Sequence, residues 1–116
     1  MNQNDEKPDP MFRGDGDDGY VDMAPGIRRR TLVHGERALL AAFRLEAGSR
    51  IPEHSHPEEQ TGYLVSGAMT FYIGGETHSA RPGDSWSIPG GVKHAVDVRE
   101  DSLAIEAFSP VRKDYL

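Results

Sequence analysis

Short runs of β-forming residues, separated by turn residues at close intervals, are the feature that most restricts the fold of this chain. Strand-like runs such as TGYLVSG, AMTFYIGG and SLAIEAFSP alternate with turn-forming segments such as EAGS, GGE and RPGD. No apolar repeat with the helical period of about 3.6 residues persists, which disfavours long helices. Many short strands with regular turns are typical of an antiparallel sandwich or barrel, so the sequence predicts an all-β fold.

The length of 116 residues allows one domain with a modest core. The first nineteen residues differ from the rest, because they carry six acidic and two basic residues, several Pro and Gly, and few apolar residues. Such a composition does not bury enough apolar surface to order a chain. We therefore predict a disordered acidic N-terminal tail over residues 1–20 and one folded domain over residues 21–116.

Composition also argues against several classes of function. The net charge of -6 argues against nucleic acid as a partner. The chain holds no run of about 18 apolar residues, so we expect no membrane span. The absence of cysteine removes disulfides, thiolate ligands and thiol nucleophiles, and it fits a cytoplasmic protein. The apolar run RALLAAFRL needs cover if it forms an edge strand, so we expect a homodimer.

Alternation assigns side chains to faces, because residues two apart in a strand point the same way. In the run SLAIEAFSP, Leu103 and Ile105 share one face, whereas Glu106 and Phe108 share the other. A carboxylate on a buried face costs free energy unless it has a partner or a function. Glu106 is therefore a candidate functional residue. Arg112 could instead be its salt-bridge partner, which would make the pair structural.

The stretch HSHPEEQTGYLVSG contains several potential metal ligands. Two histidines one residue apart in a strand point to the same side, and imidazole binds first-row transition ions well. Such a pair also occurs among exposed or core histidines, so by itself it is a weak indication. A neighbouring amide and a later histidine complete a possible site. The candidate metal ligands are His54, His56, Gln60 and His94.

A neutral amide in this set has a chemical consequence. Three imidazoles and the amide oxygen of Gln60 leave the charge of a divalent ion undiminished, which favours an anionic substrate and Lewis-acid chemistry. The same neutral set disfavours oxygen activation by iron. Glu58 or Glu59 could replace Gln60 as a ligand, although side-chain parity favours Gln60. The set accepts Zn, Ni, Fe, Co or Mn, so the sequence indicates one divalent transition-metal ion of unspecified identity.

The spacing around these ligands follows two motifs. The first runs from Gly48 through the two histidines and Gln60 to Gly67, and the second runs from Gly83 to His94. Both resemble, in order and in spacing, the two motifs of the cupin superfamily. The resemblance implies a double-stranded β-helix, or jelly-roll barrel, that holds the metal ion inside on these four ligands.

Within the cupins the chain resembles the KdgF group, on the segments HSHPEEQTGYLVSG, IGGETHSARPGDSWSIPGGVKHA and EAFSPVRKDYL. KdgF cupins are associated with pectin and alginate breakdown. The resemblance implies ring opening and ketonisation of 4,5-unsaturated uronate monosaccharides, the products of polysaccharide lyases. It implies Glu106 as the catalytic acid/base, Arg112 as a clamp for the substrate carboxylate and Phe108 as an apolar wall. The group is expected to carry Asp where this chain has Glu106, so the chain departs from the pattern there.

Two other interpretations stay open. An iron-dependent dioxygenase or another small-molecule cupin enzyme would use the same barrel, since one fold supports many chemistries. A non-catalytic sugar- or metal-binding cupin would need the ligands and no acid/base. Trp86 belongs either to the core or a subunit contact, or to the pocket wall. The favoured expectation is an enzyme that acts on a small anionic, sugar-like substrate.

Overall fold

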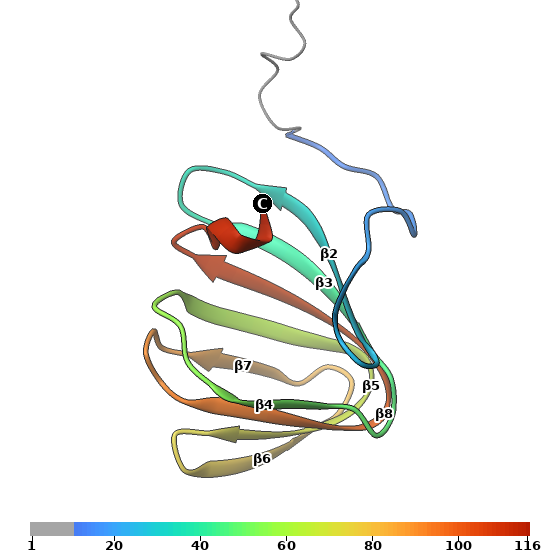
Figure 1. The fold of residues 1–116 in the computed structure, drawn as a ribbon, viewed down its shortest axis with the longest axis vertical. Coiled ribbons are helices and arrows are strands. Elements are labelled where there is room, and N and C mark those ends of the chain that lie inside the picture. Colours follow the sequence, from blue (N-terminus) through green and yellow to red (C-terminus); the bar gives the residue numbers. More distant parts are fainter. Residues whose placement is uncertain (1–10) are drawn as a thin grey trace, which may run out of the picture.

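The computed structural model describes residues 11–116, which fold into an all-β structure (Figure 1). The all-β prediction is confirmed: eight strands form in this range, and a short 3₁₀-helix, η2, follows the last of them. The elements are β1 (Val21–Ala24), β2 (Ile27–His34), β3 (Leu39–Leu45), β4 (Arg50–His54), β5 (Glu59–Ile73), β6 (Glu76–Ala80), β7 (Ser85–Ile88), β8 (His94–Ser109) and η2 (Lys113–Tyr115). No helix within the described part of the chain is long and apolar enough to cross a membrane.

Two long strands, β5 and β8, organise the sheet by pairing antiparallel along most of their length. Their other neighbours change along the way. The C-terminal half of β8 also pairs with β3, and its N-terminal end pairs with β4. Likewise, β5 pairs with β7 near its start and with β6 near its end. The sheet therefore consists of two halves that fold over each other, with β1 and β2 beyond β3, which is the predicted jelly-roll arrangement (Figure 1).

The bend between the two halves occurs where the register of β5 against β8 shifts, between Leu64 and Met69. Gly67 lies within this bend with a φ of +99°. A Cβ at this position would lie 2.1 Å from Oγ of Ser102 and 2.5 Å from the carbonyl oxygen of Asp101. Only glycine fits both the backbone conformation and the space. The motif glycine at this position thus allows the long strands to pass from one half to the other.

Alternate residues of the strands build a core between the two halves. Leu64, Phe71, Val98 and Phe108 are at most 3% exposed. Burial of each such side chain stabilises the fold by about 1.5–3 kcal/mol. Glu106 lies on this buried face of β8, as alternation predicted.

Residues 1–10 of the predicted N-terminal tail lie outside the described residues. The segment that follows contacts the sheet through charged groups: Arg30 donates to the backbone oxygen of Asp18 at 2.7 Å, and Arg44 pairs with Asp17 at 3.2 Å. Arg30 is only 4% exposed beneath this segment. The boundary between tail and domain stays a prediction.

Candidate metal centre and active site

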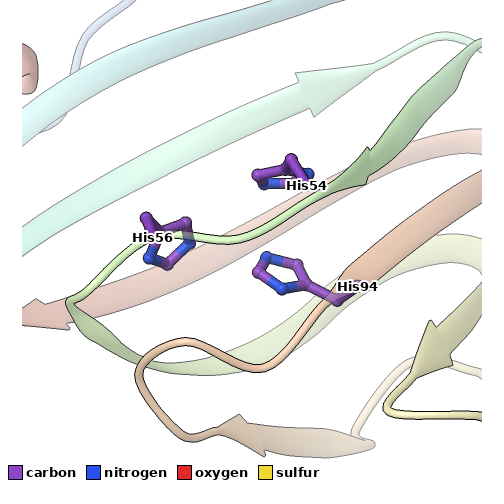
Figure 2. Close-up of side chains that lie close together, drawn as sticks. All are labelled: His54, His56 and His94. Carbon is purple, nitrogen blue, oxygen red and sulfur yellow. The ribbon is translucent and has the colours of Figure 1, made fainter.

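Three histidines from two segments of the chain meet beside β4 and β8 (Figure 2). His54 ends β4 and His94 begins β8, and the two are partners in the antiparallel register. His56 lies beyond the end of β4, so the prediction that both members of the His-x-His pair lie on one strand is wrong for His56. Its ring nevertheless turns to the same place, because one nitrogen from each histidine lies within 4.8 Å of the others.

A backbone carbonyl faces Nδ1 in each of the three rings. In each histidine Nδ1 lies 2.8 to 3.0 Å from the carbonyl oxygen of a residue two positions away. A carbonyl oxygen only accepts, so in His54 and His94 Nδ1 carries the proton and Nε2 carries a lone pair. In His56 an oxygen of Gln60 also faces Nε2, and the tautomer with the proton on Nδ1 is the one that can bind a metal ion through Nε2. Backbone hydrogen bonds orient metal-binding histidines in this way, which leaves three coordinating nitrogens free.

The Nε2 atom of His94 is buried and has no hydrogen-bond partner among the described residues. A buried lone pair without a partner costs free energy, and a metal ion would satisfy it. Burial lowers the pKa of His94, and burial together with the nearby Arg112 lowers the pKa of His56. Both rings are therefore held neutral and able to coordinate. On these grounds the three histidines fit a divalent metal ion.

Gln60 lies next to the histidines on β5 and is 7% exposed. Its Nε2 donates to Oε1 of Glu106, which turns its own Oε1 toward His56, 3.0 Å from Nε2 of that ring. With the His56 proton on Nδ1, two lone pairs face each other there, and a cation that binds both would satisfy them. Glu59 is exposed, and the Glu58 carboxylate lies 3.5 Å from Nδ1 on the other side of the ring. The geometry favours Gln60 over both alternatives as the fourth donor.

Glu106 is the buried carboxylate of the site, at 9% exposure. Its Oε1 accepts hydrogen bonds from Gln60 and from Nε1 of Trp86, the latter at 2.8 Å. Burial raises the pKa of Glu106, and the two hydrogen bonds and the charge of Arg112 oppose this shift without cancelling it. Such a carboxyl group is suited to exchange protons with a bound molecule. No ion pair joins it to Arg112 among the described residues, so the structural salt-bridge alternative is not supported.

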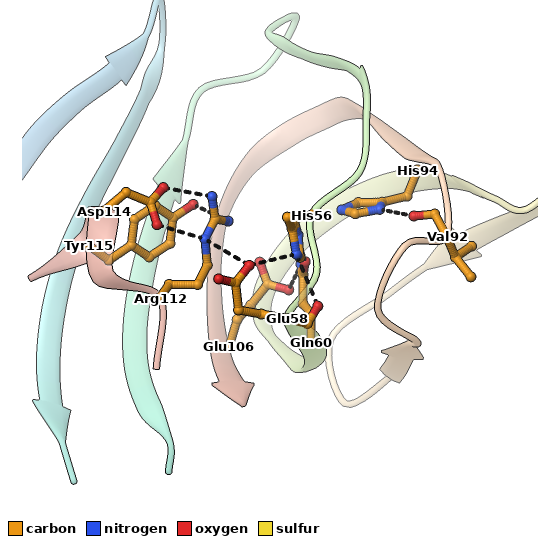
Figure 3. A network of polar contacts seen from close by, with 9 residues as sticks. All are labelled: His56, Glu58, Gln60, Val92, His94, Glu106, Arg112, Asp114 and Tyr115. Atoms are coloured by element: carbon orange, nitrogen blue, oxygen red, sulfur yellow. Dashed lines mark hydrogen bonds and ion pairs between the residues drawn. The ribbon is translucent and has the colours of Figure 1, made fainter. Parts of the chain in front are cut away.

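Arg112 follows β8 and is held at the cavity by the C-terminal segment (Figure 3). Its guanidinium carbon lies 4.0 Å from the ring centroid of Tyr115 and 5.2 Å from that of Phe108. It pairs with Asp114 at 2.8 Å and, more loosely, with Glu58 at 3.9 Å. The cation is thus oriented by two rings and keeps one weak ion pair that another carboxylate could replace.

Most of the predicted site residues, though not His56, line one cavity of about 260 Å³, near the lower end of the range for small-molecule pockets. Its wall is mainly apolar. The predicted site residues that line it are His54, Gln60, His94, Glu106, Phe108 and Arg112. A cavity of this size and lining suits a small molecule.

Two residues near the acid group were missed or left undecided by sequence reasoning. Tyr115 lines the cavity and is 7% exposed, although no pattern near the C-terminus indicated a buried ring. Trp86 reaches Glu106. The sequence feature that could have indicated this contact is Gly62, which leaves a space without a side chain on the inward face of β5. A Cβ at Gly62 would overlap the Trp86 indole.

Comparison with known proteins agrees with this description. Residues 41–109 match the family described as Cupin domain. The pectin degradation protein KdgF of Dickeya dadantii (strain 3937) is 25% identical over 104 residues, which cover 88% of this chain and 94% of that protein. The structure of KdgF from Halomonas sp. has a TM-score of 0.80 and 33% identity, covering 84% of this chain and 90% of that chain.

A third protein extends the likeness in fold. An RmlC-like cupin from Shewanella frigidimarina NCIMB 400 has a TM-score of 0.86 at 23% identity, covering 93% of this chain and 98% of that chain. This similarity concerns the fold alone. Because the family match spans most of the barrel and the Halomonas relative covers nearly all of it, the chain belongs to the cupin family and is a KdgF-like cupin.

Proposed function

We propose that this protein is a metal-dependent enzyme that opens the ring of 4,5-unsaturated uronate monosaccharides and converts them to linear keto sugar acids. The observation that carries the proposal is the buried carboxylate of Glu106, which shares one cavity with neutral metal donors and a guanidinium. The relative from Dickeya dadantii is described as a pectin degradation protein, which supports a uronate as the substrate.

One divalent ion, Zn, Ni, Fe, Co or Mn, would be held by His54, His56, Gln60 and His94. When bound, the ion supplies Lewis acidity and positive charge toward oxygen atoms of the substrate. All four donors are neutral, so they leave the charge of the ion intact. An anionic small molecule is therefore the substrate class that this part of the cavity favours.

Glu106 would move the proton that the reaction requires. Its carboxylate takes the proton of the anomeric hydroxyl while the bond between the anomeric carbon and the ring oxygen breaks. The aldehyde forms, and the electron pair moves to the ring oxygen, which becomes an enolate beside the substrate carboxylate. Return of the proton to the far carbon of the double bond gives the ketone. The reaction is an isomerisation that consumes no water and no second substrate.

Arg112 and Phe108 would position the sugar. A guanidinium matches a carboxylate with two parallel hydrogen bonds, and Arg112 already has its plane set by ring contacts. The weak ion pair with Glu58, at 3.9 Å, is the one that the substrate carboxylate would replace. Phe108 is 1% exposed and packed in the core, so it offers an apolar wall against which the sugar can be oriented.

The test follows the ultraviolet absorbance of the conjugated double bond in an unsaturated uronate freshly made by a polysaccharide lyase. Metal-loaded wild type should remove the absorbance faster than the spontaneous background. Glu106→Gln should lower the rate by about 10²–10⁴-fold at unchanged metal content, because it keeps the shape and removes the base. A wild-type rate equal to background would contradict the proposal. Parallel oxygen uptake would favour the dioxygenase, and binding without turnover would favour a non-catalytic cupin.

We also propose that the protein is a homodimer. Tyr63 and Val65 are both 47% exposed on the outer face of β5, and Tyr63 is paired with the partly exposed Ile105. Apolar side chains that gather on an outer sheet face mark a surface for association. Light scattering on the purified chain of 12.8 kDa should give twice this mass, and a mass equal to one chain would contradict the proposal.

A further inference from the structure

Trp86 reaches the buried carboxylate by crossing a neighbouring strand. It lies on β7, where its register partner on β5 is Gly62. Gly62 is also the partner of Glu106 on β8, so the three residues form a row across the sheet. The indole of Trp86 spans β5 and donates its N–H to Oε1 of Glu106 at 2.8 Å. The row therefore connects β7 to Glu106, the buried carboxylate of the cavity.

Gly62 makes this crossing possible. A Cβ at that position would lie 2.3 Å from both Cε2 and Nε1 of Trp86, a separation that real Cβ contacts do not show. The indole thus occupies the space that any other residue would fill. The ring of Phe71 also packs on the indole, with the two centroids 4.4 Å apart. The indole is held between the backbone of Gly62 and the ring of Phe71, so its N–H points in one direction, toward Glu106.

The two oxygens of Glu106 consequently have different surroundings. Oε1 accepts from both Trp86 and Gln60, and two donors use the two lone pairs of a carboxylate oxygen. Among the described residues no hydrogen bond reaches Oε2, and Glu106 lines the cavity. Neither donor can take a proton from a substrate, because an indole N–H and an amide N–H only donate.

We propose that Trp86, placed by Gly62, is a positioning residue that gives the two oxygens of Glu106 separate tasks. Oε1 is the anchored oxygen, and Oε2 is the atom that takes the proton from the anomeric hydroxyl and returns it to the enolate carbon. The inference rests on the proposed function, since it names the atom that performs the proton transfer. It also makes Gly62 a residue of the site through the space that it leaves.

Two variants test this role. Trp86→Phe keeps an aromatic ring and removes the N–H, so kcat should fall about tenfold while KM changes less than about twofold, because the orientation of the acid is lost and binding is not. Gly62→Ala keeps every functional group and displaces the indole. Trp86 is the one tryptophan of the chain, so its fluorescence reports the displacement directly. Gly62→Ala should shift the emission and lower kcat by a similar factor.

Each variant has a matched control. Tyr72→Phe also removes one hydrogen bond to a carboxylate, that of Tyr72 to Asp97 at 2.8 Å, but outside the cavity, so kcat should stay unchanged. Gly35→Ala adds a methyl group with nothing within 4 Å of it, so both emission and kcat should stay unchanged. Circular dichroism and metal content of all variants confirm that they are folded and loaded.

The outcomes separate this inference from the proposed function. Wild-type turnover with an unchanged kcat in both Trp86→Phe and Gly62→Ala would overturn the role of Trp86 alone. Equal losses in a variant and its control would also overturn it, because they would indicate a general effect on stability. No turnover by the wild type would overturn the proposed function and this inference with it.

Discussion

Replacing Tyr115 by alanine should destabilise the protein and weaken substrate binding, although this residue is the last but one in the chain. Its side chain is 7% exposed, and its ring centroid lies 6.2 Å from that of Phe43 and 5.3 Å from that of Phe108. Arg29 and Arg112 each place a guanidinium carbon 4.0 Å from the same centroid. The ring therefore joins the core to the cation of the cavity.

The size of the effect follows from these contacts. A buried aromatic side chain removes at least about 150 Å² from water, worth about 4 kcal/mol at about 25 cal/mol per Å². The real unfolded chain already buries part of this area, and alanine keeps Cβ, so about 3 kcal/mol remains. Two cation–π contacts add about 1 kcal/mol at the low end of the usual range. The free energy of unfolding of Tyr115→Ala should thus fall by about 4 kcal/mol, a usual cost for deleting a buried ring.

Guanidinium denaturation, followed by the fluorescence of Trp86, measures this loss, and the uronate assay measures KM. Tyr115→Phe is the matched control, because it removes only the hydroxyl that accepts from Arg112 at 2.9 Å, and it should cost about 1 kcal/mol. KM should rise in the alanine variant, where Arg112 loses its stack, and stay near wild type in the phenylalanine variant. A loss below about 1 kcal/mol in Tyr115→Ala would refute the placement of this ring in the core.

Three further predictions concern pH, the bend and the metal. Asp97 accepts hydrogen bonds from Tyr72 and Arg50, which hold its pKa below the ordinary value for an aspartate. A depressed carboxyl pKa stabilises the fold above the unfolded-state pKa, and this gain is lost as the pH falls through the folded-state pKa. The difference in Tm between wild type and Asp97→Asn should therefore disappear in acid. A difference that persists would contradict the assignment. Gly67→Ala should cost about 3 kcal/mol or more through positive φ and overlap, whereas Gly48→Ala, with a φ of +86° and nothing within 4 Å, should cost about 1 kcal/mol. Equal losses of unfolding free energy in these two variants, measured by urea denaturation, would contradict the role of Gly67 in the bend. A divalent ion at about a thousand times its Kd should raise the free energy of unfolding by about 4 kcal/mol, and His94→Ala should abolish this gain. Equal stabilisation of that variant, measured by calorimetry, would place the ion elsewhere.

Fold class and the buried face of the acid could be predicted from sequence because both depend on local patterns. Alternation along one strand is enough to put Glu106 and Phe108 on the same side, and the structure confirms that both are buried. Turn residues between short β-forming runs are enough to predict the strand-rich fold. Alternation along the strands, together with the spacing of the two motifs, predicts which positions carry the polar groups of the cavity.

The remaining contacts depend on which segments become neighbours, and no short window of sequence contains that information. Trp86 acts across β5, so its partner is known only once β7, β5 and β8 are seen side by side. Tyr115 is buried because the C-terminal segment returns to β2, where Thr31 donates to the backbone oxygen of Tyr115 at 2.6 Å. His56 was expected on the same strand as His54, but β4 ends at His54 and His56 lies in the segment that follows.

The amide at Gln60 can be understood from its two neighbours. One end faces Nε2 of His56, and the other end donates to Oε1 of Glu106. A cation site needs an acceptor there and a carboxylate needs a donor, and an amide side chain offers both. A glutamate at position 60 would turn one oxygen toward His56 and the other toward Glu106. The two carboxylates would then lie within hydrogen-bond distance and would repel each other unless they shared a proton. Trp86 would then be the single donor left for Oε1. The neutral amide thus lets an anionic acid/base stay beside the candidate cation site while the ion keeps its charge for an anionic substrate.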